Sequence, residues 1–277
     1  MHSGTRFVDL HLHTRYSDGS WTPDELCRAA AQLRLAAIAV TDHDTLDGIP
    51  EALAAGQQHG VEVLPAVEIT CRIKTREVHL LGCFTGNTWQ SPELHTVLDH
   101  AKRVREKRIG EIVARLNEHG IALTTADVFE CSTCGTTGRP HVALALRHRG
   151  VVKSVDEAFE RFLKSGKPGY VERYRMEAAE AIALIKRAGG VAVLAHPGLS
   201  QADKEIQNLA QQGLAGLEVW HCRHTPAQTE HYRALAERFD LLVTGGSDCH
   251  GAVLGKILLG TVPVPYECVT AIKRTAQ

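Results

Sequence analysis

Short apolar runs alternate with amphipathic stretches along most of the chain. Each run suits a buried strand and is far too short to span a membrane. The runs lie at residues 6–12, 36–40, 61–67, 78–84, 191–195, 214–220 and 241–246. Between most of them, apolar residues recur at helical spacing, as Leu26, Ala29, Ala30 and Leu33 do. Alternating strands and helices predict a parallel sheet, and its closure gives a seven-stranded, TIM-like α/β barrel.

Capping signals mark several helix boundaries. Thr22 with Glu25, and Ser154 with Glu157, have the spacing of a capping box, which satisfies free N–H groups at the start of a helix. Gly60 is expected to end a helix that begins near residue 48, because glycine readily adopts the left-handed conformation of a helix stop. A long helix is predicted from residue 91 to about residue 119.

The middle of the chain departs from this alternation. No strand pattern occurs between Leu98 and Lys167, whereas helical stretches are predicted at 125–130, 141–147 and 154–164. We therefore predict a helical insert at residues 99–170, set into a catalytic barrel formed by residues 1–98 and 171–277. The strand–helix alternation resumes after Gly166-Lys167-Pro168-Gly169-Tyr170.

Charge is distributed unevenly, although the whole chain of 277 residues has a net charge of only −1. The segment from Asp99 to Arg175 carries 15 Lys and Arg against 10 Asp and Glu, so the rest of the chain is acidic. The near-neutral total argues against broad nucleic-acid binding, while a basic segment beside an acidic remainder suggests a small anionic substrate. A solvated helical surface is the alternative explanation of the same charges.

The eight cysteines are scattered and lack the spacing of a disulfide framework. Cys131 and Cys134 form a single CxxC pair, for which an ordinary loop is a better explanation than a zinc or redox site. No signal peptide or membrane-spanning run is visible, so we expect a cytoplasmic protein with reduced thiols. Nothing in the sequence indicates an obligate protein partner.

Ionisable residues follow six of the seven predicted strands. His11 and His13 share one face of their strand, because side chains alternate along a strand, and two such imidazoles can hold one metal ion. Taken alone, this pair could equally be two surface histidines. The other strand-end residues are Asp18, His43, Glu68, His196, Asp248 and His250. The carboxyl ends of barrel strands meet at one rim, so we expect these eight side chains to lie together.

With His79, near the start of the fourth strand, these side chains supply six imidazoles and three carboxylates. This is enough for two or three divalent ions, with Glu68 suited to bridge two of them. Mixed nitrogen and oxygen ligands suit zinc, manganese or iron and suit calcium poorly. Adjacent ions can share a water, lower its pKa to give a hydroxide nucleophile, and clamp phosphoryl oxygens.

The complete ligand pattern resembles that of the PHP (polymerase and histidinol phosphatase) family. The matching motifs are His11-x-His13, Asp18, Asp42-His43, Glu68, His79, His196-Pro197 and Asp248-x-His250. The resemblance implies a distorted seven-stranded barrel with a trinuclear metal centre. Within the insert, Gly138-Arg139-Pro140-His141 and residues 166–170 resemble the branch of 3′,5′-nucleoside bisphosphate phosphatases, whose relatives trim RNA from its 5′ end.

The resemblance also implies a role for each residue. The first ion would be held by His11, His13, Glu68 and Asp248, the second by Glu68, His79 and His196, and the third by Asp18, His43 and His250. Asp248 would also accept a proton from the bridging water, and Asp9 would support the ligands without binding an ion. Arg139, His141, Lys167 and His224 would contact the phosphates and the leaving group, with His224 or His141 as the general acid.

Together these observations predict a phosphatase that removes the 3′ phosphate of a nucleoside 3′,5′-bisphosphate and leaves the 5′-monophosphate. A 5′–3′ exoribonuclease acting on short 5′-phosphorylated RNA is the alternative. Histidinol phosphatase is a further candidate, but a long basic insert suits a substrate with a second phosphate better. A non-catalytic metal-binding module is disfavoured, because such a module would be expected to have lost ligands and none of the nine is missing.

Overall fold

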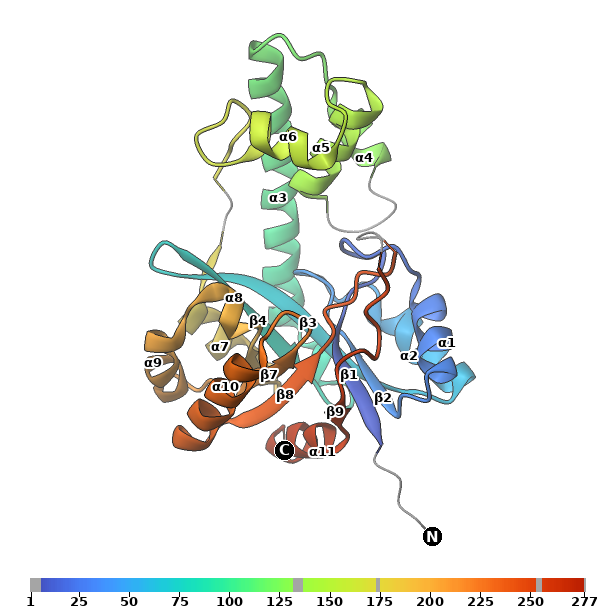
Figure 1. The fold of residues 1–277 in the computed structure, drawn as a ribbon, viewed down its shortest axis with the longest axis vertical. Helices are drawn as coiled ribbons and strands as arrows, with labels where there is room; N and C mark the ends of the chain where they lie inside the picture. Colours follow the sequence, from blue (N-terminus) through green and yellow to red (C-terminus); the bar gives the residue numbers. More distant parts are fainter. Residues whose placement is uncertain (1–5, 132–136, 173–174, 253–255, 277) are drawn as a thin grey trace. The chain divides into compact units, whose positions relative to one another are not determined.

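The computed structural model describes residues 6–131, 137–172, 175–252 and 256–276. Cys134 of the CxxC pair is outside these residues. The chain forms two compact units, one of residues 1–97 and 175–277, here called the barrel unit, and one of residues 98–174, the insert unit. Figure 1 shows both.

The strands of the barrel unit form one sheet that is nearly closed (Figure 1). Among the described residues there are nine: β1 (Phe7–Leu12), β2 (Ala37–Val40), β3 (Glu62–Ile73), β4 (Arg76–Cys83), β5 (Met176–Glu177), β6 (Val191–Leu194), β7 (Gly216–His221), β8 (Leu242–Gly246) and β9 (Val264–Pro265). Their order is β8-β7-β6-β4-β3-β2-β1-β9, with the short β5 paired to β3. The segment after β8 bonds back to β1, since the Asp248 N–H donates to the His11 carbonyl at 2.9 Å. The α/β barrel class predicted from the sequence is therefore confirmed.

Two details of the predicted sheet are wrong. The strand expected to end at Glu68 continues to Ile73, so Glu68 lies in the middle of β3 rather than at a strand end. The sheet is also not wholly parallel, because β4 pairs antiparallel with both β3 and β6. The reason is a tight hairpin at Lys74, whose φ of 58° reverses the chain between β3 and β4.

This hairpin explains how His79 reaches the ligand-bearing rim. The beginning of an antiparallel strand lies beside the end of its partner, and His79 pairs with Thr70 late in β3. On β3, every second side chain points the same way, so Leu64, Ala66 and Glu68 share one face. The face that packs in the apolar core therefore leads directly to Glu68, a predicted ligand.

Helices cover the outside of the barrel (Figure 1). They are α1 (Pro23–Gln32), α2 (Ile49–His59), α7 (Ala178–Arg187), α8 (Pro197–Ser200), α9 (Ile206–Gln211), α10 (Pro226–Arg238) and α11 (Glu267–Thr275), with 3-10 turns η1 (Thr88–Gln90) and η3 (Asp203–Glu205). The capping box of Thr22 and Glu25 is present, and Gly60 ends α2 in the left-handed conformation, as predicted.

The described part of the insert unit is helical. It contains most of α3 (Pro92–Glu118), together with α4 (Thr125–Glu130), α5 (Arg139–His148), α6 (Val155–Ala158) and a π-helical turn, η2 (Phe159–Leu163). Its separate apolar core includes Ile112, Leu116, Val142, Leu146 and Leu163. None of the helices in the described segments is long and apolar enough to cross a membrane.

The close approach of β8 to β1 predicts that Gly246→Ala destabilises the barrel. A Cβ at Gly246 would lie 2.4 Å from the His11 Cβ and 2.5 Å from the His11 nitrogen, so the backbone of β1 or β8 would have to move. We expect a loss of about 1–3 kcal/mol, typical of overpacking, measured by denaturant unfolding of the metal-free protein. The control is Gly110→Ala in α3, where a Cβ meets nothing within 4 Å. Unchanged stability of Gly246→Ala would contradict this packing.

Candidate metal centre

All nine predicted ligands belong to the barrel unit, and the structure brings them together. His11 is the penultimate residue of β1, His13 follows the strand, and Asp18 lies in the next turn. His43 follows β2, while Glu68 and His79 face each other from β3 and β4. His196 follows β6, and Asp248 and His250 follow β8. Six strands of the barrel and the loops next to them therefore converge on one cluster.

The Glu68 carboxylate is the centre of this cluster and is only 1% exposed. Five imidazole rings have a nitrogen within 3.3 Å of it. Its Oε2 faces His11 Nε2 at 3.3 Å, His13 Nε2 at 3.2 Å and His43 Nδ1 at 3.2 Å. Its Oε1 faces His79 Nδ1 at 2.7 Å and His196 Nε2 at 3.1 Å. A carboxylate with rings on both oxygens has the arrangement that a bridge between two ions requires.

The two aspartates complete the cluster on either side of His13. Asp248 Oδ1 lies 3.2 Å from His13 Nε2 and 3.6 Å from His11 Nε2. Asp18 Oδ1 lies 3.3 Å from His250 Nε2, and its Oδ2 lies 3.7 Å from His43 Nε2. Three overlapping groups of potential ligands result: His13 with Asp18, His43 and His250; His11 with His13 and Glu68; and His43 with Glu68 and His79.

The donor atoms fit divalent ions. The Nε2 atoms of His11 and His13 are buried, yet neither makes a well-formed hydrogen bond, although carboxylate oxygens lie nearby. Buried nitrogens left in this way are unfavourable unless another partner completes them. Imidazole nitrogens mixed with carboxylate oxygens are the donors that zinc, manganese and iron accept.

Electrostatics show that the cluster requires positive charge. Burial opposes ionisation of Glu68, but the neighbouring imidazoles together outweigh burial and hold the pKa of Glu68 well below its usual range. Burial likewise opposes protonation of His13, yet its carboxylate neighbours Asp248, Glu68 and Asp18 raise its pKa to about 10. In His43 burial prevails and lowers the pKa to about 3, so this ring is neutral. Without metal ions, protons on some of the rings must balance the buried carboxylates.

Two ligands have strained backbones. His196 has a φ of 28° and Asp248 a φ of 54°, a region that residues with a side chain rarely occupy. Such strain persists only where surrounding contacts impose it, and it is concentrated at functional sites. The His196 N–H donates to Glu218 at 2.7 Å, and the Asp248 N–H donates to the His11 carbonyl.

Buried aspartates hold the loops that carry the ligands. Asp42 accepts hydrogen bonds from the Thr14 backbone and hydroxyl and from the Ser17 hydroxyl, which fixes the turn leading to Asp18. Asp9 accepts from the backbone N–H groups of Ser247 and Gly260. Asp9 contacts no ligand side chain through these bonds, and it ties β1 to the segment beginning at Ser247.

Two residues of this site were missed by sequence reasoning. Glu218, in the middle of β7, accepts a hydrogen bond from His11, and His221, at the end of β7, places Nε2 3.5 Å from Asp248 Oδ2. A single carboxylate inside an apolar run is a signal that could have identified Glu218. His221 follows a strand in the same way as the predicted ligands do.

The expected substrate contacts lie in both units. His224, in the barrel unit, donates from Nδ1 to the Val219 carbonyl and accepts at Nε2 from the Gly198 N–H. Burial lowers its pKa. Both ring nitrogens are thus engaged, and this conformation holds a neutral ring without a proton on Nε2. To donate a proton from Nε2, His224 would have to give up the Gly198 contact.

Arg139, His141 and Lys167 belong to the insert unit. Arg139 is the first residue of α5 and donates to the Leu163 carbonyl. His141 Nδ1 accepts from the Gly138 N–H at the start of the same helix. Lys167 is exposed. Their assignment as substrate contacts stays a prediction.

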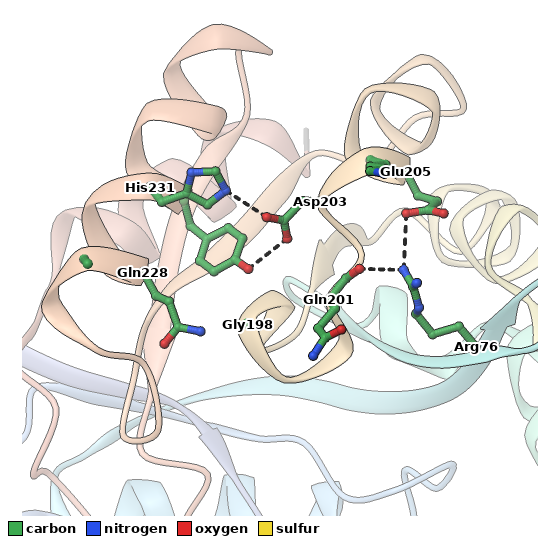
Figure 2. Close-up of a pocket in the computed structure, with 10 residues that line it drawn as sticks. Arg76, Gly198, Gln201, Asp203, Glu205, Gln228 and His231 are labelled. Atoms are coloured by element: carbon green, nitrogen blue, oxygen red, sulfur yellow. Dashed lines mark hydrogen bonds and ion pairs between the residues drawn. The ribbon is translucent and has the colours of Figure 1, made fainter.

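A separate pocket of about 630 Å³ lies on the barrel unit beside α8 and α10. Figure 2 shows that most of the charged groups lining it are paired with one another: Asp203 binds His231 and Tyr232, and Arg76 binds the Gln201 carbonyl and Glu205. It does not contain the ligand cluster, although Gly198 in its lining is two residues from His196.

Comparison with known proteins agrees with the fold and with a metal-dependent phosphoesterase activity. A 5′–3′ exoribonuclease of Haemophilus influenzae is 34% identical over 89% of this chain and 90% of its own. A 3′,5′-nucleoside bisphosphate phosphatase of Chromobacterium violaceum is 33% identical over 88% and 87%. The crystal structure of a Bifidobacterium adolescentis protein, proposed to be a metal-dependent phosphoesterase, superposes with a TM-score of 0.88 at 33% identity, covering 98% of this chain and 97% of that one.

A nearly closed α/β barrel with histidine and carboxylate ligands around a buried glutamate defines a metal-dependent hydrolase. The chain belongs to the PHP domain family, whose pattern matches residues 9–238. It is a hydrolase of phosphate esters that uses divalent metal ions.

The charge balance predicts how the metal-free protein responds to pH. The pKa of His13 rises to about 10 in the folded protein from 6.5, so its stabilisation is complete below about pH 6.5 and is lost as the pH rises toward 10. We expect the melting temperature of chelator-treated protein to fall by several degrees over this range. The rise in melting temperature caused by added metal should increase with pH over the same range, because metal ions then supply the positive charge that protons no longer supply.

Thermal melts at pH 6.5 to 10, with and without metal, would measure this effect. His13→Asn is the control and should flatten the decline of the metal-free protein. A melting temperature that rises with pH in metal-free wild type would contradict the proposed balance of charge.

Proposed function

We propose that this enzyme removes the 3′ phosphate of nucleoside 3′,5′-bisphosphates and releases the 5′-monophosphate. The observation that carries the metal-dependent part is the convergence of five imidazoles on the buried Glu68 carboxylate. The substrate follows from the C. violaceum relative, which is a 3′,5′-nucleoside bisphosphate phosphatase, and from the basic insert.

We assign two or three ions of manganese, zinc or iron to this cluster. His11, His13, Glu68 and Asp248 would hold the first, Glu68, His79 and His196 the second, and Asp18, His43 and His250 the third. When bound, such ions activate water and neutralise the charge of the phosphoryl oxygens. We assign the Asp248 carboxylate, which lies near the His11 and His13 rings, as the group that accepts a proton from the activated water.

A second phosphate needs its own binding groups, and the insert carries candidates. Arg139 offers two donors in a planar fork that matches a phosphate, whereas Lys167 offers a point charge. Binding energy gained on a phosphate that does not react can be used to orient the one that does. We therefore assign the 5′ phosphate to Arg139 and Lys167, with His141 and His224 as further substrate contacts.

The alternative function is that of a 5′–3′ exoribonuclease acting on short 5′-phosphorylated RNA. It is favoured by the H. influenzae relative, which is as similar to this chain as the phosphatase is. Both reactions break a phosphate ester beside a 5′-phosphorylated nucleotide, so the same metal centre serves either.

We also infer a cytoplasmic location from the seven described cysteines, all of which are free thiols.

The proposal predicts that kcat/KM depends on the second phosphate. Adenosine 3′,5′-bisphosphate should be cleaved at least tenfold more efficiently than adenosine 3′-monophosphate, because only the former has a 5′ phosphate to bind. Arg139→Ala should lower kcat/KM for the bisphosphate. The corresponding loss of transition-state stabilisation should be about 1.5–3 kcal/mol, the range for hydrogen bonds to charged groups. Its activity on p-nitrophenyl phosphate should be nearly unchanged.

Steady-state kinetics on these three substrates and on a 5′-phosphorylated ribo-oligonucleotide would test this. Arg147→Ala, an exposed arginine on the same helix as Arg139, is the matched control and should behave like wild type. Equal wild-type values for the bisphosphate and the 3′-monophosphate would exclude a second phosphate site. A strong preference for the oligonucleotide would favour the exoribonuclease.

A further inference from the structure

We infer that Glu218 is a positioning residue of the metal centre, which sets the tautomer of His11 and holds the strained backbone of His196. The inference rests on the ligand roles that the proposed function gives to these two histidines. It adds a residue that the nine-ligand pattern does not contain.

Glu218 is fully buried in the middle of β7, and both of its carboxylate oxygens are occupied. One oxygen accepts from His11 Nδ1 at 3.0 Å, and the other accepts from the His196 backbone N–H at 2.7 Å. Glu218 forms a potential ligand group with His11 and His221. Its oxygens are already committed, however, so we assign it to support rather than to ion binding.

The bond to His11 decides which ring nitrogen can bind an ion. A carboxylate without a proton can only accept, so His11 must carry its proton on Nδ1. In the neutral form of the ring, which is the form that binds an ion, the lone pair is then on Nε2, the atom that lies 3.3 Å from Glu68 and 3.6 Å from Asp248. A carboxylate behind a metal-binding imidazole fixes its tautomer and orientation and makes it a stronger donor.

The bond to His196 acts on the backbone. With φ of 28° and ψ of 59°, His196 lies outside the conformations that a residue with a side chain prefers. A buried charge-assisted hydrogen bond to its N–H offsets part of that cost. Through one side chain, β7 therefore aligns two ligands that come from β1 and from the end of β6.

Glu218→Gln separates this role from simple space filling, because it keeps the shape and removes only the charge. One amide oxygen can still accept one hydrogen bond, but the NH₂ group must face the other partner. If it faces His11, the ring has to move its proton to Nε2, where it blocks the ion. If it faces the His196 N–H, two donors oppose each other.

The first measurement is metal binding to apo-protein, by competition of Mn²⁺ and Zn²⁺ with a chromophoric chelator. Glu218→Gln should bind at least one ion about 10–100-fold more weakly, and saturating metal should restore activity. The control is Thr244→Val, which removes a buried hydroxyl directly opposite Glu218 on β8 and should bind like wild type. Wild-type affinity and stoichiometry in Glu218→Gln would overturn the inference.

The second measurement does not depend on whether Glu218→Gln folds, because it is made on wild type. Nitrogen-15 NMR of the histidine rings in zinc-loaded wild type, with His11 assigned through His11→Gln, should find the His11 proton on Nδ1. A proton on Nε2 would refute the role of Glu218.

These outcomes are distinct from failure of the proposed function. Wild type that binds ions but does not cleave the bisphosphate refutes the substrate and leaves Glu218 in place. Wild type that binds no ion refutes the ligand assignment and this inference together.

Discussion

The Glu68 carboxylate is buried in the barrel and has no access to water that could solvate its charge. Removing a carboxylate from water costs several kcal/mol unless charges and hydrogen-bonding groups replace the solvent. Five imidazoles surround it, and three of them, those of His11, His13 and His43, also lie near Asp18, Asp248 or Glu218, so positive charge must be present whatever the state of the protein. Metal ions can supply this positive charge at neutral and higher pH. Protons on the imidazole rings supply it when no ion is bound. The nearly closed sheet brings the ligands of six strands to this one buried carboxylate.

The sheet accommodates the cluster through local departures from regular structure. The hairpin at Lys74 reverses β4, so that His79 enters the site from the beginning of a strand while His11 enters from an end. His196 and Asp248 have positive φ angles, and buried hydrogen bonds from the neighbouring strands β7 and β1 hold them. Each departure costs stability, which the apolar core of the barrel supplies. These hydrogen bonds fix the backbones of two ligands, an arrangement that favours donors already in position before ions bind.

Much of this architecture could be predicted because its signals are local. The Thr22 capping box and the glycine stop at Gly60 depend on residues a few positions apart, and both are present. The path of β4 could not be predicted, since Lys74 at the turn is neither glycine nor asparagine and the alternation of strands and helices favours parallel pairing. Glu218 was missed because its partners are more than 20 and 200 residues away in sequence. Periodicity reports which face a residue occupies, but not which distant backbone it will support.

Substrate choice is a different matter from metal binding in this family. The H. influenzae and C. violaceum relatives have nearly the same identity to this chain, yet one is an exoribonuclease and the other a bisphosphate phosphatase. A metal centre recognises the phosphoryl group under attack, and that group is present in both reactions. Residues outside the ligand set must therefore distinguish the rest of the substrate.

Within the barrel, a ring such as His224 that is engaged at both nitrogens can be released only by breaking existing bonds. The insert unit has its own core and carries Arg139 and Lys167 on helical and loop segments that do not build the barrel. If Arg139 and Lys167 bind substrate as proposed, changes at these two residues alter recognition and leave the ligands around Glu68 in place.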